Sequence, residues 1–147
     1  MLNPFDDSYF MRQAILEANK AFDANEVPVG AVVIAGNQVI GRGYNLTEKL
    51  HDVTAHAEIQ ALTAAANFLG AKYLKECTLY VTLEPCPMCA GALYWSQIGK
   101  VCYGATDEKR GSTRHHPSLY HPSTDLQGGI EAEPCVHLLR TFFEGKR

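Results

Sequence analysis

The sequence has no long apolar run, no internal repeat and no low-complexity tract. Its longest largely apolar stretch, Val27–Ala35, is far shorter than the roughly 20 residues that a membrane-spanning helix needs. The first ten residues are acidic and lack the basic flank and apolar core of a signal peptide. We therefore expect a cytoplasmic protein without a membrane partner.

Cysteine and charge are also sparse. The chain has 5 cysteines, and such an odd number fits reduced thiols or metal ligands better than a disulfide framework. Charged residues make up 20% of the chain and the formal net charge is −3, so the overall charge does not indicate a nucleic-acid-binding protein. More than half of the basic residues nevertheless lie in residues 97–147, and any basic binding surface is expected there.

What the chain does contain is an ordinary globular mixture, with 46% hydrophobic residues in 147, which suits one domain spanning residues 1–147. Spacings of three and four, alternating runs and turn residues predict the secondary structure. Thr54 is the expected N-cap of the second helix, and residues 105–127 are expected to form a long loop. This order of elements predicts an α/β sandwich. The predicted helices are 7–25, 54–69, 88–96 and 136–143, and the predicted strands are 29–34, 39–44, 78–82, 101–103 and 126–130.

Two short segments carry the residues of a metal site. His56-Ala57-Glu58 stands near the start of the second predicted helix, and Pro85-Cys86-Pro87-Met88-Cys89 opens the third, with 26 residues between Glu58 and Pro85. Because helix N-termini favour negative charge, both cysteines can bind a metal as thiolates there. One imidazole and two thiolates leave the fourth position of a tetrahedral zinc open, as in catalytic sites. The spacing matches the His-x-Glu…Pro-Cys-x-x-Cys signature of zinc nucleobase deaminases.

Glu58 is the predicted catalytic residue. It lies too close to His56 in sequence to be an obvious second ligand, but it is well placed beside a metal-bound water. We expect a zinc-bound hydroxide to attack an amidine-like carbon, while Glu58 takes the proton of the water and returns it to the ring nitrogen and the departing ammonia.

Two alternatives account for the same residues. A structural zinc site would need a fourth ligand from the remaining cysteines and histidines, and it leaves Glu58 without a role. A thioredoxin-like redox pair would use Cys86 and Cys89 but needs no upstream His-x-Glu. The possible fourth ligands are Cys77, Cys102, Cys135, His51, His115, His116, His121 and His137.

The sequence resembles the cytidine-deaminase superfamily, and within it the bacterial tRNA-specific adenosine deaminases. The resemblance runs from about Tyr9 to the C-terminus. It implies a three-layer α-β-α sandwich with helices on both faces of a mixed sheet of about five strands. It also implies one Zn²⁺ per chain, a homodimer, and hydrolysis of the wobble adenosine to inosine by attack at C6. The matching stretches are Glu26–Ala31, His51–Glu58, Leu79–Cys86, Met88–Ala92 and Ile98–Asp107.

The resemblance further implies which residues bind the tRNA anticodon arm. The adenosine would meet Val29, Asn45 and the backbone of Ala57 and Glu84, although Val29 and Asn45 taken alone also read as a core residue and a turn residue. Asp107 would accept a hydrogen bond from a 2′-hydroxyl, so that RNA and not DNA is the expected partner. Phosphate and anticodon-base contacts would come from Lys109, Arg110 and Arg114, and from Phe142 or Phe143.

The chain departs from the family pattern at Arg110–Pro117, where a loop rich in Gly and Ala is usual. In addition, the segment from Cys86 to Trp95 is similar to bacterial guanine deaminases. A core or interface position is the alternative interpretation of Tyr94 and Trp95 in this segment. Deamination of a free base or nucleoside (guanine, cytosine or adenosine) is therefore the alternative function, and a non-catalytic zinc module is the third.

Overall fold

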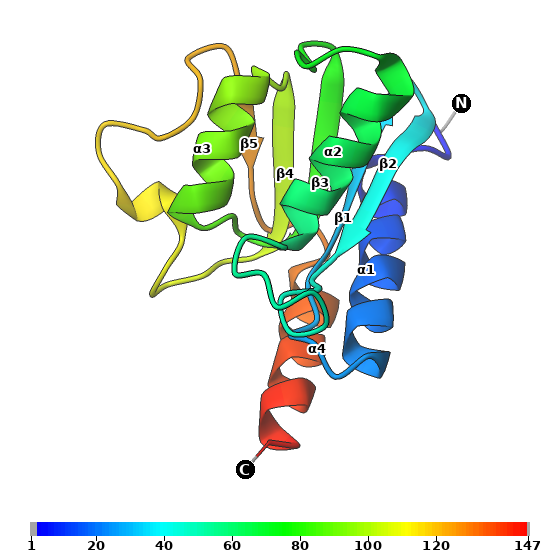
Figure 1. Ribbon diagram of the computed structural model, residues 1–147, viewed down its shortest axis with the longest axis vertical. Helices are drawn as coiled ribbons and strands as arrows, with labels where there is room; N and C mark the ends of the chain where they lie inside the picture. The colour runs from blue at the N-terminus through cyan, green and yellow to red at the C-terminus, as the bar shows by residue number, and fades with distance from the viewer. Residues whose placement is uncertain (1–2, 147) are drawn as a thin grey trace.

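The computed structural model describes residues 3–146, and its centre is one mixed five-stranded sheet in the order β2-β1-β3-β4-β5 (Figure 1). β1 pairs antiparallel with both β2 and β3, whereas the β3–β4 and β4–β5 pairs are parallel. The mixed sheet expected from the sequence is thus confirmed. The strands are β1 (Gly30–Ala35), β2 (Gln38–Tyr44), β3 (Cys77–Leu83), β4 (Lys100–Ala105) and β5 (Asp125–Gln127).

Helices cover both faces of the sheet, which confirms the predicted three-layer α-β-α sandwich. Alternate residues of β1 enter two separate buried clusters, because side chains of a strand point to opposite faces. Ala31 and Val33 pack beneath α2 (Ala57–Leu69) and α3 (Pro87–Ser96). Val32 and Ile34 pack against α1 (Asp7–Asp23) and α4 (Ala132–Glu144) on the other face.

Some predicted boundaries were wrong. Thr54 does not cap α2, because its N–H and its hydroxyl both bond to Asp52 Oδ1 in the preceding turn, and the helix begins after His56. The last helix begins at Ala132, four residues earlier than expected, since Glu133 and Pro134 suit a first turn. The last strand covers only 125–127, and the loop before it contains a 3-10 turn, η1 (Ser112–Arg114).

The strand directions bring four chain-distant segments to one edge of the sheet. The start of β1 and the end of β2 are paired through Gly30 and Tyr44, and the end of β3 lies beside the end of β4 through Leu83 and Ala105. The residues just outside these ends therefore gather at the same edge. They are Val29, Asn45, Glu84 and Asp107. The family resemblance implies a role in substrate binding for each of them.

Helix α2 lies so close to β2 that only glycine fits between them. A Cβ built on Gly43 would come within 2.6 Å of the carbonyl oxygen of Ala57 and 2.7 Å of the amide nitrogen of Ala61. This approach positions the first turn of α2 over the sheet. Among residues 3–146, no helix is long and apolar enough to cross a membrane.

We expect Gly43→Ala to destabilise the protein by about 1–3 kcal/mol, because the added methyl group has to push α2 off the sheet. Urea denaturation measures this change. Gly145→Ala is the matched control, since a Cβ there meets its neighbours at 3.5 Å, an ordinary contact, and it should stay within about 0.5 kcal/mol of the parent. Equal stability of the two variants would contradict the close packing described here.

Candidate active site

His56, Cys86 and Cys89 form one cluster at this edge of the sheet. The Nδ1 atom of His56 lies 3.7 Å from Cys86 Sγ and 3.4 Å from Cys89 Sγ. All three ligand atoms lie within 4.8 Å of one another. Ligand atoms on one tetrahedral zinc are about 3.5–3.8 Å apart, given the usual Zn–N and Zn–S bond lengths. The cluster therefore fits a metal ion with little movement of the side chains.

Two of these residues occupy the N-cap positions of the helices. His56 precedes α2 and Cys86 precedes α3, and neither side chain makes a capping hydrogen bond. Ser, Thr, Asp or Asn usually fills such a position and satisfies the first amides of the helix. Here both side chains turn toward each other instead, and Cys89 joins them from the first turn of α3. The helix starts surround the cluster with N–H groups, which stabilise negative charge.

The pKa values of the two thiols shift in opposite directions. The hydrogen bond from Cys89 lowers the pKa of Cys86 to about 4, and His56 adds to the effect. The same hydrogen bond, together with burial, raises the pKa of Cys89. Cys86 is thus a ready thiolate, whereas a metal has to displace the proton of Cys89, as is usual when thiols bind metals.

Glu58 lies in the first turn of α2 with only 3% of its surface exposed. Burial raises the pKa of its carboxyl group to about 7. A carboxyl group with a pKa near neutrality can both accept and return a proton, which is the property that a general acid–base needs. The buried environment therefore suits the role predicted for Glu58.

A cavity of about 270 Å³ opens beside the cluster. Most of the predicted site residues line it, although they come from five separate segments of the chain. Cys89 lies in the cluster but is fully buried beneath this cavity. The predicted residues in the wall are Val29, Asn45, His56, Ala57, Glu58, Glu84, Cys86, Asp107 and Arg110.

Lys109 and Phe143 do not line this cavity. Lys109 is exposed on the loop between Asp107 and Arg110, which do line the cavity. Phe143 lies on α4 and is 50% exposed, whereas Phe142 is buried and packs edge-on against Phe22. Neither phenylalanine therefore lines this cavity, but Phe142 lines a second cavity next to it.

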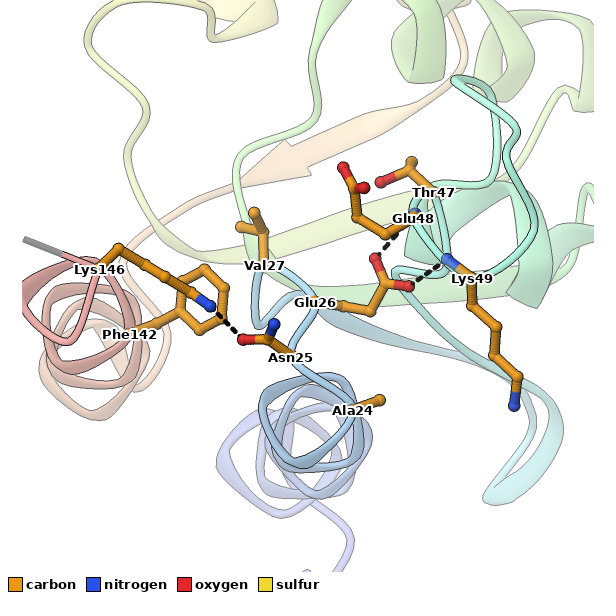
Figure 2. Close-up of a pocket in the computed structure, with 9 residues that line it drawn as sticks. All are labelled: Ala24, Asn25, Glu26, Val27, Thr47, Glu48, Lys49, Phe142 and Lys146. Carbon is orange, nitrogen blue, oxygen red and sulfur yellow. Dashed lines mark hydrogen bonds between the residues drawn. The ribbon is translucent and has the colours of Figure 1, made fainter.

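That neighbouring cavity, of about 560 Å³, shares Val27 and Thr47 with the first (Figure 2). Figure 2 shows why its wall is ordered: the carboxylate of Glu26 accepts hydrogen bonds from the backbone N–H groups of Glu48 at 3.0 Å and Lys49 at 2.8 Å. Val27 and Thr47, which line both cavities, and Glu26, which lines the neighbouring one, were not predicted from the sequence. A buried acidic residue that binds backbone amides has no sequence pattern, so only the fold reveals it.

Comparison with known proteins agrees with this geometry. The profile of the MafB19-like deaminases matches residues 5–127. The chain is 40% identical to the tRNA-specific adenosine deaminase of Agrobacterium fabrum, over 95% of each protein. A solved structure from a study of tRNA:A34 deaminases superposes with a TM-score of 0.84 and 39% identity, over 90% of this chain and 99% of that one. The guanine deaminase of Bacillus subtilis is 38% identical with a TM-score of 0.66, over 69% of this chain and 65% of that one.

The sandwich with its His/Cys/Cys cluster beside a buried glutamate defines a hydrolytic deaminase of the cytidine-deaminase type. Within that class, the chain belongs to the family of tRNA-specific adenosine deaminases.

We expect His56→Ala and Cys86→Ala to lose a bound zinc ion, because each removes one of three closely spaced donors. Elemental analysis of the purified proteins gives the zinc content per chain. Cys77→Ser is the control, since Cys77 is a buried free thiol of β3 outside the cluster, and its zinc content should equal that of the parent. Full zinc occupancy in the His56 or Cys86 variant would mean that other residues bind the metal.

Proposed function

We propose that this enzyme hydrolyses the wobble adenosine of a tRNA anticodon loop to inosine. The observation that carries the proposal is the buried Glu58 beside the His56, Cys86 and Cys89 cluster, at a cavity in a member of this family. The overall reaction consumes one water molecule and releases ammonia from C6 of the base. Position 34 is unpaired in the anticodon loop, which lowers the cost of bringing its base into a cavity.

His56, Cys86 and Cys89 would hold one Zn²⁺ per chain, which suits their two sulfur donors and one nitrogen donor. When bound, zinc lowers the pKa of a water molecule so that it can attack carbon at neutral pH. Glu58 would take one proton of the water and pass it to N1 of the adenine ring. It would then move the second proton, from the hydroxyl group left on C6, to the amino group, which departs as ammonia while the C6 carbonyl forms. Its burial suits the task, because a carboxyl group away from water can exist in either protonation state near pH 7.

The cavity wall supplies the contacts to the nucleoside. Val29 and the ring of His56 offer apolar faces for the base, while Asn45 and the backbone of Ala57 and Glu84 offer hydrogen-bonding groups at its edges. Asp107 lines the same cavity, and its carboxylate can accept a hydrogen bond from a 2′-hydroxyl and thereby favour RNA over DNA.

Basic and aromatic residues around the mouth support a longer RNA substrate. Arg110 lines the cavity, and Lys109 and Arg114 are exposed on the same loop, in reach of the phosphates that flank a bound nucleoside. The adjoining cavity contains Lys49, Lys146 and Phe142, and the exposed Phe143 follows Phe142 on α4. These features provide room and charge for nucleotides next to the target, which a free base does not require.

A homodimer in the cytoplasm is part of the proposal, with residues 1–147 acting as one domain. On α3, Trp95 is 76% exposed and Tyr94 packs edge-on against it. Large exposed aromatic side chains that adjoin one another are typical of protein–protein interfaces. A second copy covering α3 would also enlarge the surface available to an anticodon arm.

Deamination of a free nucleobase or nucleoside, such as guanine, cytosine or adenosine, is the alternative function. The similarity to a guanine deaminase favours it, since the same cluster and glutamate serve either kind of substrate.

We expect Glu58→Gln to lower kcat by at least about 10²-fold, because glutamine cannot transfer a proton. The zinc content should stay at that of the parent, since Glu58 is not a ligand in this proposal. Glu76→Gln on the exposed turn before β3 is the matched control and should leave both quantities unchanged. Loss of zinc in the Glu58 variant would make Glu58 a ligand and contradict its proposed role.

We expect inosine to form in an anticodon stem-loop that carries adenosine at position 34, and to depend on salt, because phosphate contacts weaken as ionic strength rises. Zinc-loaded enzyme is incubated separately with the stem-loop, free adenosine, guanine, cytosine and cytidine, and mass spectrometry detects the gain of about one dalton that deamination produces. Conversion of guanine, or of another free substrate, with the stem-loop unchanged would favour the alternative function.

A further inference from the structure

We propose that the side chain of Glu84 is a positioning residue, which together with Thr113 sets the location of the loop that carries Asp107 and Arg110. This inference rests on the proposed function, because it assigns the loop a role in holding RNA. Glu84 follows β3 and directly precedes Pro85 and the cluster residue Cys86. Only 2% of its surface is exposed.

The two carboxylate oxygens of Glu84 accept hydrogen bonds from Asp107 and Thr113, which lie at the two ends of the loop segment 107–113. Its Oε1 accepts a hydrogen bond of 3.1 Å from the N–H of Asp107. Its Oε2 accepts two hydrogen bonds from Thr113, of 2.9 Å from the backbone N–H and 2.7 Å from the hydroxyl. No Lys, Arg or His among residues 3–146 forms a salt bridge with this carboxylate. The hydrogen bonds from the loop therefore stabilise its buried charge, and the charge in turn orders the loop.

Only a carboxylate satisfies both ends at once. The N–H of Asp107 and the N–H of Thr113 reach different oxygens, and backbone amides cannot act as acceptors. A glutamine at position 84 would direct its NH₂ group at one of these donors in either orientation. The site is also full, because a Cβ on Gly111 would overlap the carboxyl group of Glu84.

A second set of contacts fixes the loop to the same turn. The N–H of Ser112 donates to the carbonyl oxygen of Pro85 at 2.9 Å, and the Ser112 and Tyr120 hydroxyls are 2.7 Å apart in a buried pair. The loop is thereby held in register with the turn that carries Cys86.

The position of this loop determines how an RNA substrate is held. Asp107 and Arg110 line the cavity, and Asp107 Oδ1 accepts hydrogen bonds from the N–H groups of Lys109 at 3.1 Å and Arg110 at 3.0 Å. Both residues thus move with the loop. Glu58 and Cys89 lie instead in the first turns of α2 and α3, and His56 is the residue before α2, so the helices position them and not this loop. Weakening the Glu84–Thr113 contact should therefore impair RNA binding more than the chemical step.

Thr113→Val tests this, because valine keeps the shape and the backbone N–H but removes the hydroxyl. We expect KM for the adenosine-34 stem-loop to rise about 10-fold, the effect of losing a hydrogen bond to a charged group, with kcat and zinc content unchanged. Thr113→Ser restores the hydroxyl and should return KM to the parent value. An unchanged KM in the valine variant, or a fall in kcat of the same size as the rise in KM, would overturn the proposal.

Amide hydrogen exchange provides a measurement that does not depend on activity. Exchange in residues 105–114 should become faster in Thr113→Val and in Glu84→Gln than in the parent and in Thr113→Ser. Equal exchange in all four proteins would refute the positioning role. If the parent enzyme leaves the stem-loop unchanged, the proposed function fails, and exchange alone then decides whether Glu84 holds the loop.

Discussion

The starts of two helices meet over one edge of the sheet, and the location of the chemistry depends on this meeting. Helix α2 can approach because Gly43 leaves room for its first turn, and α3 arrives there because it connects the parallel strands β3 and β4. Each helix start carries unpaired N–H groups and a partial positive charge. The hydrogen bond from the Cys89 thiol, the contact with His56 and the backbone N–H of Cys89 at the start of α3 together stabilise the thiolate of Cys86. The His/Cys/Cys cluster thus lies where the fold places the starts of α2 and α3 next to each other.

The loops in the cavity walls follow a different principle, because they lack the regular hydrogen bonding of helices and strands. Two buried carboxylates organise them in the same way. Glu26 binds the amides of Glu48 and Lys49, and Glu84 binds the amides of Asp107 and Thr113. Each carboxylate gains the hydrogen bonds that a buried charge requires, and each loop gains acceptors for N–H groups that no strand or helix would satisfy. Substituting either glutamate would therefore cost more than one contact.

Much of this could be predicted from the sequence, for physical reasons that particular residues make clear. The β-prone run 29–34 beside a Gly/Asn turn predicted a strand, and the order of helices and strands predicted an α/β sandwich. The resemblance to a known family implied the helices on both faces. The cluster of His56, Cys86 and Cys89 was predictable because metal binding restricts the residue types and their spacing. The start of α2 was misplaced because Thr54 has two possible partners, and the hydroxyl bonds to Asp52 and not to a helix amide. The side-chain role of Glu84 was missed because its partners are mostly backbone amides, which leave no mark on the sequence.

The division between helices and loops separates reaction from substrate choice. Cys89 and Glu58 stand in the first turns of helices that pack against the sheet, so their geometry depends on the helices more than on the loops. Asp107 and Arg110 reach the same cavity from a loop that is held by the Glu84 carboxylate and by the contacts of Ser112, and a few substitutions there can alter what the cavity accepts. The residues after β4 should therefore distinguish substrates better than the His/Cys/Cys cluster does. In this chain they include the carboxylate of Asp107, proposed for a ribose hydroxyl, and the basic side chains of Lys109, Arg110 and Arg114, proposed for phosphates.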